Sequence, residues 1–264
     1  MSALPATLAL AGAAFRAATR SRLNALLALF GLALFGALKV MSDASVNQDE
    51  RLFKDLGLFL TSTLALLTSV GLSASSLHRE LERKSAFSLL SKPIPRAALL
   101  WGKLLGHALT TLTLVALCAL TWGLLAWRQG LPVEWVMAQG FALAWLESLI
   151  VLGVGLLLSS FSTPLVTAGL TLGAALAGRF SGDLQALHER ALRRGESSLG
   201  LELAERALTL LPDLSLYDAT AQAVYGGGAP LPASYLWSAG LSALAYAALC
   251  ALCASWVFAR RDLI

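Results

Sequence analysis

Long runs of apolar residues, separated by short polar segments, dominate the pattern of this chain. A helix that crosses a bilayer needs about 20 mostly apolar residues, and six runs reach or approach that length. They are continuous rather than alternating, which favours helices over the strands of a membrane barrel. We therefore predict six membrane-spanning helices, at residues 23–40, 56–77, 104–127, 135–161, 164–180 and 235–258.

The composition excludes two large classes of protein. Of the 264 residues, 57% are hydrophobic and 14% are charged, whereas a soluble domain carries about 25% charged residues. A soluble globule of this composition would have more apolar surface than it could bury, and a disordered chain would be more polar. The sequence thus predicts an all-α integral membrane protein with a single transmembrane domain over residues 1–264.

The distribution of basic residues predicts the orientation of the chain. An even number of spans puts both termini on one side, and cytoplasmic loops are enriched in Lys and Arg. The side of the termini would hold Arg16, Arg20, Arg22, Arg79, Arg83, Lys84, Lys92, Arg96, Lys103, Arg260 and Arg261. The short loops of the other side would hold Lys39, Arg51, Lys54 and Arg128. We therefore predict that the N and C termini are cytoplasmic.

Two segments outside the spans have helical patterns. Residues 1–22 are moderately apolar with spaced arginines, which favours a helix lying in the inner membrane interface, although an extension of the first span also fits. Residues 181–233 form a predicted outer loop in which apolar positions recur at helical spacing. The glycines at 226–228 and Pro230 predict a break before the last span.

The predicted inner loop, residues 78–103, combines charge with exposed apolar side chains. Its charged first part is followed by Phe87, Leu89 and Leu90, and the prolines at 93 and 95 then stop any helix. A solvated loop needs no such apolar residues. They either rest on the bilayer surface or dock a partner in a groove, and the pattern alone fits both.

Motifs of catalysis and of phosphate binding are absent from the sequence. It contains no G-x-x-x-x-G-K-[ST], H-E-x-x-H or G-x-S-x-G. The three histidines are far apart, and the Cys250-x-x-Cys253 spacing lies inside a span, where thiols are unreactive small residues. We therefore expect no catalytic, metal-binding or cofactor-binding residues in this chain.

Two features inside the spans are candidates for function. Glu147 is an acid deep in the fourth span, and ionisable groups at that depth are costly. It is either protonated and hydrogen-bonded to another helix or used in transport, for example to carry protons. The fifth span carries Gly169, Gly173 and Gly178 on a small-residue face, which indicates close helix packing within the chain or across a dimer.

A longer motif covers the inner loop. The run from Glu80 to Arg96 reads ELERKSAFSLLSKPIPR and is followed by Gly102-Lys103. It resembles the corresponding loop in permease subunits of type-2 ABC exporters. Shorter stretches along nearly the whole chain agree with that family: Phe15-Arg16, Lys54 to Leu58, Ser159 to Pro164, Leu211 to Leu214, and Phe258 to Asp262. Ala17, Ser85 and Ala86 depart from the family pattern.

The resemblance implies a non-catalytic permease of six spans in the bacterial cytoplasmic membrane, with a coupling helix in the inner loop. That helix would dock a separate ABC ATPase, which would bind ATP and Mg²⁺. A second permease copy or a homologous permease would complete a central path for an unknown substrate. Membrane lipids are the other expected partner, and nucleic acid is not expected. The residues expected to contact the ATPase are Glu80, Glu82, Arg83, Lys84, Phe87 and Leu90.

Two other functions remain open at this point. The first is a secondary transporter that is driven by protons through Glu147. The second is a membrane anchor that does not transport and that uses the same ATPase to regulate an envelope machine.

Overall fold

The computed structural model describes residues 3–21, 49–82, 96–182, 212–226 and 228–260, with a few single positions between 25 and 36. Every regular element in this part of the chain is a helix, which confirms the predicted all-α class. The elements are α1 (Ala3–Thr19), α3 (Asp49–Glu82), α5 (Arg96–Gln129), α6 (Trp135–Ser159), α7 (Pro164–Arg179), η1 (Ser215–Tyr217), α10 (Thr220–Tyr225) and α11 (Ala233–Ala259).

Among the described residues, four helices are long and apolar enough to cross a membrane. These four correspond to the predicted spans 56–77, 104–127, 135–161 and 235–258. The prediction for 164–180 coincides with α7, a helix of 16 residues. The predicted span 23–40 lies outside the described residues apart from single positions. The four segments are Glu50–Ser75, Ala97–Gln129, Trp135–Ser159 and Ala233–Phe258.

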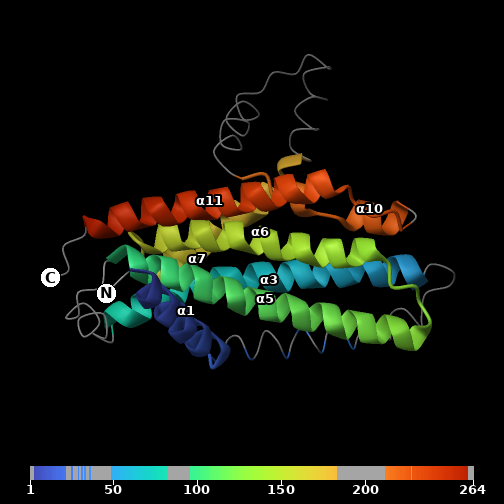
Figure 1. Ribbon diagram of the computed structural model, residues 1–264, viewed down its shortest axis with the longest axis horizontal. Coiled ribbons are helices and arrows are strands. Elements are labelled where there is room, and N and C mark those ends of the chain that lie inside the picture. Colours follow the sequence, from blue (N-terminus) through green and yellow to red (C-terminus); the bar gives the residue numbers. More distant parts are fainter. Residues whose placement is uncertain are drawn as a thin grey trace, which may run out of the picture.

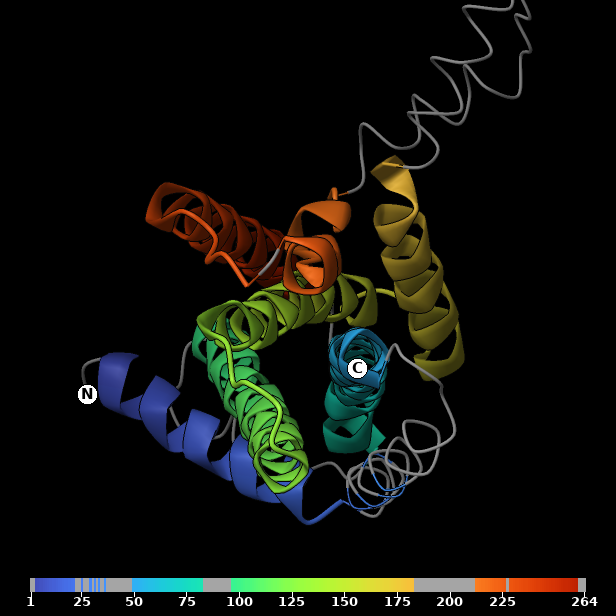
Figure 2. The same ribbon diagram turned by 90° about the vertical axis from the view of Figure 1, so that its right-hand side faces the viewer.

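The long helices form a bundle around α6. In Figure 1, α3, α5, α6 and α11 run side by side along the long axis, and the end-on view of Figure 2 shows α6 among the others. Helix α6 packs against α3, α5, α7 and α11. It is apolar on all sides, and most of its residues are buried, as expected for the central helix of a bundle.

Glycines on α6 allow neighbouring helices to come close. A Cβ atom added at Gly140 would lie 2.7 Å from Leu58 Cδ2 of α3, and one at Gly153 would lie 3.0 Å from Ala247 Cα of α11. A larger side chain at Gly153 would push α6 and α11 apart, and one at Gly140 would displace the Leu58 side chain. The bundle therefore follows the small-residue packing that is common between membrane helices.

The outside of the bundle is apolar and bears aromatic residues near the helix ends. On α11, Trp237 is 80% exposed and Trp256 is 59% exposed. These residues are separated by about 28 Å of helix, close to the ~30 Å hydrocarbon thickness of a bilayer. Their positions match the interfacial aromatic belts of membrane proteins.

Helix α1 lies across α5 at one end of the bundle, where α3 ends and α5 begins (Figure 1). Two glycines of α5 make the contact possible. A Cβ atom added at Gly102 would lie 2.6 Å from Leu10 Cβ, and one at Gly106 would lie 2.6 Å from the carbonyl oxygen of Ala11. Gly102 belongs to the Gly102-Lys103 pair noted in the sequence, so the glycine of that motif serves close packing of α1.

Candidate functional site

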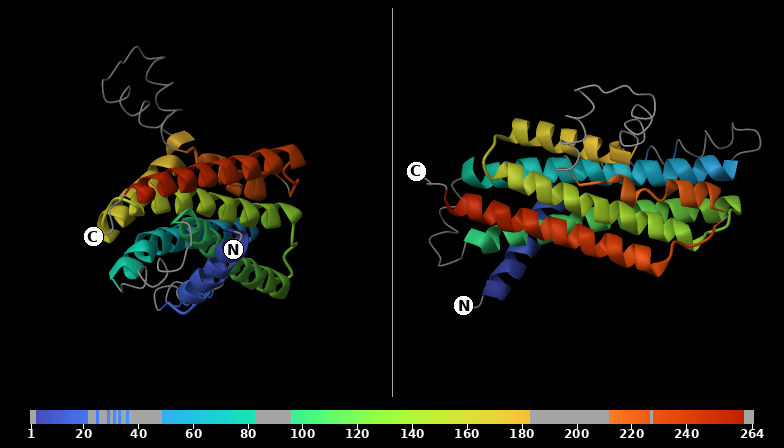
Figure 3. Two further views of the ribbon diagram at one scale, coloured as in Figure 1. Left: turned by 60° about the vertical axis from the view of Figure 1, so that its left-hand side comes forward. Right: turned by 90° about the horizontal axis from the view of Figure 1, so that it is seen from above.

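Helix α7 is short for a membrane-spanning helix, and this determines where its last residues lie. Sixteen residues extend about 24 Å, less than the ~30 Å hydrocarbon core. Figure 3 shows that α7 stops short of the far end reached by α3 and α6. Residues at its carboxyl end, including Arg179, therefore lie partway along the bundle.

The segment that begins at Pro212 returns to this end of α7. The backbone N–H of Leu214 donates to the carbonyl oxygen of Gly178 at 3.0 Å. A Cβ atom at Gly178 would lie 2.7 Å from the carbonyl oxygen of Pro212, so glycine permits this close approach. The end of α7 is thus fixed by a backbone contact between distant parts of the chain.

Asp213 strengthens the same junction. Its Oδ1 atom accepts hydrogen bonds from Ser181 Oγ at 2.5 Å, Ser215 Oγ at 2.6 Å and Ser215 N at 3.0 Å. Burial alone would raise the pKa of Asp213, but these hydrogen bonds favour the carboxylate and hold its pKa below the usual value. The junction is therefore stabilised by an ionised carboxylate.

Arg179, the last residue of α7, pairs with Glu147 of α6. Arg179 Nε donates to Glu147 Oε1 at 2.6 Å, and its Nη2 atom donates to Oε2 at 2.9 Å. The Glu147 side chain is 5% exposed and that of Arg179 is 22% exposed. Two parallel hydrogen bonds between a guanidinium and a carboxylate form a strong, directional ion pair.

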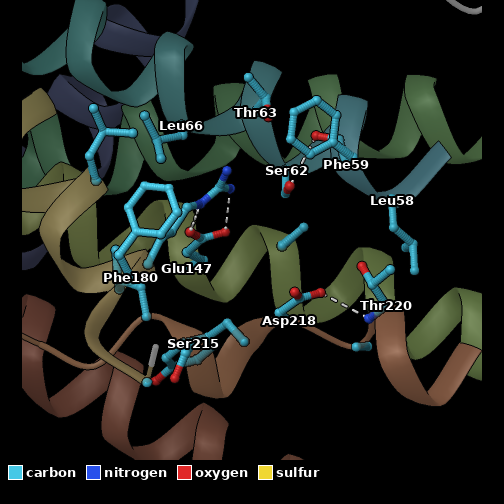
Figure 4. Close-up of a pocket in the computed structure, with 18 of the residues that line it drawn as sticks. Leu58, Phe59, Ser62, Thr63, Leu66, Glu147, Phe180, Ser215, Asp218 and Thr220 are labelled. Carbon is cyan, nitrogen blue, oxygen red and sulfur yellow. Dashed lines mark hydrogen bonds and ion pairs between the residues drawn. The ribbon is translucent and has the colours of Figure 1, made fainter. Parts of the chain in front are cut away.

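This pair forms part of the wall of a cavity of about 580 Å³ between α3, α6, α7 and the segment from Leu214 to Thr220. Glu147 lies between Ser62 and Thr63 of α3 on one side and Ser215 and Asp218 on the other (Figure 4). Much of the remaining wall is apolar. Its apolar residues include Leu58, Phe59, Leu66, Leu67, Leu172, Leu176 and Phe180.

The polar groups of the cavity differ in how well they are satisfied. Ser62 Oγ donates to the carbonyl oxygen of Phe59 at 3.1 Å, and Asp218 Oδ1 accepts the backbone N–H of Thr220 at 2.9 Å. Thr63 Oγ1 is buried and has no hydrogen-bond partner among the described residues. Two carboxylates, on Glu147 and Asp218, and one guanidinium give the described lining a formal charge of −1.

The site residues predicted inside the spans have different positions. Glu147 lines the cavity and is paired. Gly178 packs against Pro212 and Leu214, whereas Gly169 and Gly173 are on the exposed side of α7 and an added Cβ would meet no described atom within 4 Å. The small-residue face thus does not pack within the described part of the chain, except at Gly178.

The predicted ATPase-contact residues are only partly within the described chain. Glu80 and Glu82 belong to the last turn of α3. Arg83, Lys84, Phe87 and Leu90 lie outside the described residues. Their proposed role therefore rests on the sequence.

Sequence reasoning did not assign Arg179 and Asp218 to the site. Arg179 stands at the end of a short predicted span, and Asp218 follows a tight turn in a long predicted loop. The shortness of the fifth span was the available signal for Arg179, because a basic residue that ends a short helix lies within the membrane depth and needs an acidic partner.

The described residues hold no group of three or more His, Cys, Asp or Glu side chains that could bind a metal ion. On α11, Cys250 is buried and Cys253 is exposed, and both are free thiols. The described lining of the cavity contains neither a histidine nor a cysteine. What its geometry offers is binding, through an apolar wall with a few charged and hydroxyl groups.

Comparison with known proteins gives one family match. The family described as ABC-2 family transporter protein matches residues 6–263, nearly the whole chain. No curated protein matched the sequence.

Proposed function

Because the chain belongs to the ABC-2 family of transporter proteins, we propose that it is the transmembrane subunit of an exporter driven by a separate ABC ATPase. The family match and the apolar helices establish a multi-pass membrane permease of an ABC transporter. We propose in addition that transport is outward, that a separate chain hydrolyses ATP and that this chain has no catalytic activity. The single observation that carries it is the match over residues 6–263.

The ATPase is proposed to dock on the loop between α3 and α5. The chain lacks a phosphate-binding loop of its own. The ends of α3 and α5 that flank the proposed docking loop lie at the same end of the bundle as α1 (Figure 1). In this proposal Phe87 and Leu90 fill a groove on the ATPase, and the charges of Glu80, Glu82, Arg83 and Lys84 set the register.

A second permease, identical or homologous, is proposed to complete the transporter. The side of α7 that carries Gly169 and Gly173 is open in the described part of the chain, which leaves it accessible to another membrane helix. Closure of two ATPases on ATP would move the coupling loops and alternately expose a path between the two permeases. We also propose that the membrane is the bacterial cytoplasmic membrane and that both termini are inside.

Co-purification tests the ATPase proposal. The tagged full chain, isolated from its native host in mild detergent, is expected to bring down an ABC ATPase in roughly equal amount. The double variant Glu82→Arg/Phe87→Ala is expected to lose at least nine-tenths of it, because both the groove contact and the charge register are removed. Mass spectrometry with quantified bands provides the measurement.

Arg128→Glu is the matched control, because Arg128 is exposed and lies near the end of α5 that is remote from the loop. It should retain the ATPase. Loss of the ATPase from the control as well, or its retention by the double variant, would contradict docking on this loop. ATP-dependent transport by the reconstituted complex then separates an exporter from a regulatory anchor.

A proton-driven carrier requires Glu147 to exchange protons during transport. The bidentate contact with Arg179 gives this buried acid a different role, as the partner of a cation that also lies within the bundle. We therefore favour the ATP-driven permease over the carrier.

A further inference from the structure

The cavity described above has features of a binding site that the family match does not assign. Its volume of about 580 Å³ lies in the range of small-molecule pockets, which run from about 300 to 1,000 Å³. It joins four parts of the chain, and the carboxylates of Glu147 and Asp218 both belong to its wall (Figure 4). The rest of the wall can accept an apolar body.

The charge of the cavity lining indicates the charge of the ligand that the cavity favours. Arg179 Nε and Nη2 both donate to the Glu147 carboxylate, so the charge of this cation is already compensated. Asp218 is exposed, its Oδ1 atom accepts the backbone N–H of Thr220, and no cationic side chain among the described residues forms an ion pair with it. The described lining thus has one carboxylate without a cationic partner, which favours a ligand with one positive charge.

The border of the cavity indicates that the ligand is also apolar. Phe59 is 55% exposed, Leu176 is 45% exposed and Phe180 is 56% exposed, and all three contribute to the wall. An opening edged by apolar side chains admits a molecule from an apolar surrounding at little desolvation cost.

We propose that this cavity binds a monocationic amphiphile, with its apolar body between α3 and α7 and its charge near Asp218. This proposal rests on the proposed function, because it names the chemical class of the transported molecule. It makes Asp218 the residue that discriminates by charge and leaves the Glu147–Arg179 pair as a fixed part of the wall.

Two probes of similar size and opposite charge test the proposal. The purified full chain in detergent is titrated by calorimetry with tetraphenylphosphonium and, separately, with tetraphenylborate, and titrations of empty micelles are subtracted. We expect saturable binding of the cation, at least tenfold tighter than any binding of the anion. Equal binding of both, tighter binding of the borate or no saturable binding of the cation would overturn the proposal.

Variants of Asp218 locate the bound cation. Asp218→Asn keeps an oxygen that accepts the Thr220 N–H and is expected to weaken tetraphenylphosphonium binding about five- to tenfold, since it removes only the charge. Asp218→Glu should retain most of the affinity. Asp55→Asn removes a carboxylate from α3 that is not part of the cavity wall and should leave the affinity unchanged.

An affinity that does not respond to Asp218→Asn, or that falls equally in Asp55→Asn, would refute the assignment. The titrations contain no ATPase, so their failure leaves the co-purification result standing. Conversely, if no ATPase co-purifies, the binding result still decides whether the cavity takes cations. Failure of one proposal can therefore be distinguished from failure of the other.

Discussion

Replacing Glu147 by leucine is expected to lower the stability of the protein more than any other single change in the cavity wall. The variant leaves the Arg179 guanidinium within the bundle without its carboxylate, and an arginine cannot release its proton to avoid the cost. Breaking a buried pair by removal of one partner costs about 3–5 kcal/mol. Because Arg179 is partly exposed, we expect the lower end of this range, which is a fall in melting temperature on the order of 10 °C.

Thermal unfolding can be followed through the cysteines of the chain. Cys118 and Cys250 are buried and free, so a thiol-reactive fluorophore reports their exposure on unfolding, and the signal before heating, to which the exposed Cys253 can contribute, is the baseline. The double variant Glu147→Leu/Arg179→Leu should recover most of the lost stability, because no charge is then left unpaired. Arg128→Gln, which removes an exposed charge, is the control and should melt like the parent.

The single variants Glu147→Leu and Arg179→Leu and their double variant form a thermodynamic cycle. If their effects on the melting temperature simply add, the contact between Glu147 and Arg179 does not stabilise the protein and the account of the cavity wall is wrong.

A separate variant, Glu147→Gln, tests the hypothesis of a proton-driven carrier. A carrier that depends on this carboxyl group would lose transport even where the protein remains folded.

Much of the fold followed from the sequence because long apolar runs have one stable arrangement in a membrane. The helices over residues 56–77 and 135–161 were predicted from length alone, since backbone groups in a bilayer must be satisfied within a helix. The limits of α3 and α5 were not, because both helices continue into polar residues at the bundle ends. Hydropathy detects burial in lipid and not the end of a helix.

The ion pair between Glu147 and Arg179 can be inferred from the sequence only if helices α6 and α7 are considered together. Helix α6 ends at Ser159 and α7 begins at Pro164, so the two helices form a hairpin around this turn. Glu147 lies 12 residues before the turn and Arg179 lies 15 residues after it, which are about 18 Å and 22 Å along antiparallel helices. A long arginine side chain spans that difference. Asp218 gave no such signal, because its position depends on the return of residues 212–220 to the end of α7.

Replacing Gly106 by leucine is expected to detach α1 from the bundle. A Cβ atom at this position would lie 2.6 Å from the Ala11 carbonyl oxygen, 2.7 Å from Ala14 Cβ and 3.1 Å from Phe15 N. Most of these are atoms of the α1 backbone, which cannot move aside as a flexible side chain does, so the whole helix must shift. Overpacking of this kind costs about 1–3 kcal/mol, and here the cost falls on the contact between α1 and α5.

Limited proteolysis with trypsin measures this detachment. Its cleavage sites are Arg16 in α1 and Arg20 just after the end of α1, and both residues are exposed. Cleavage follows the population of the open form, so 1–3 kcal/mol corresponds to cleavage about 5- to 150-fold faster. The matched control is Gly123→Leu on the same helix, where an added Cβ meets no described atom within 4 Å. Equal cleavage rates in the two variants would mean that α1 is not held by Gly106. A large difference would establish that the close approach of α1 to α5 depends on a glycine one helical turn after Gly102 of the Gly102-Lys103 motif.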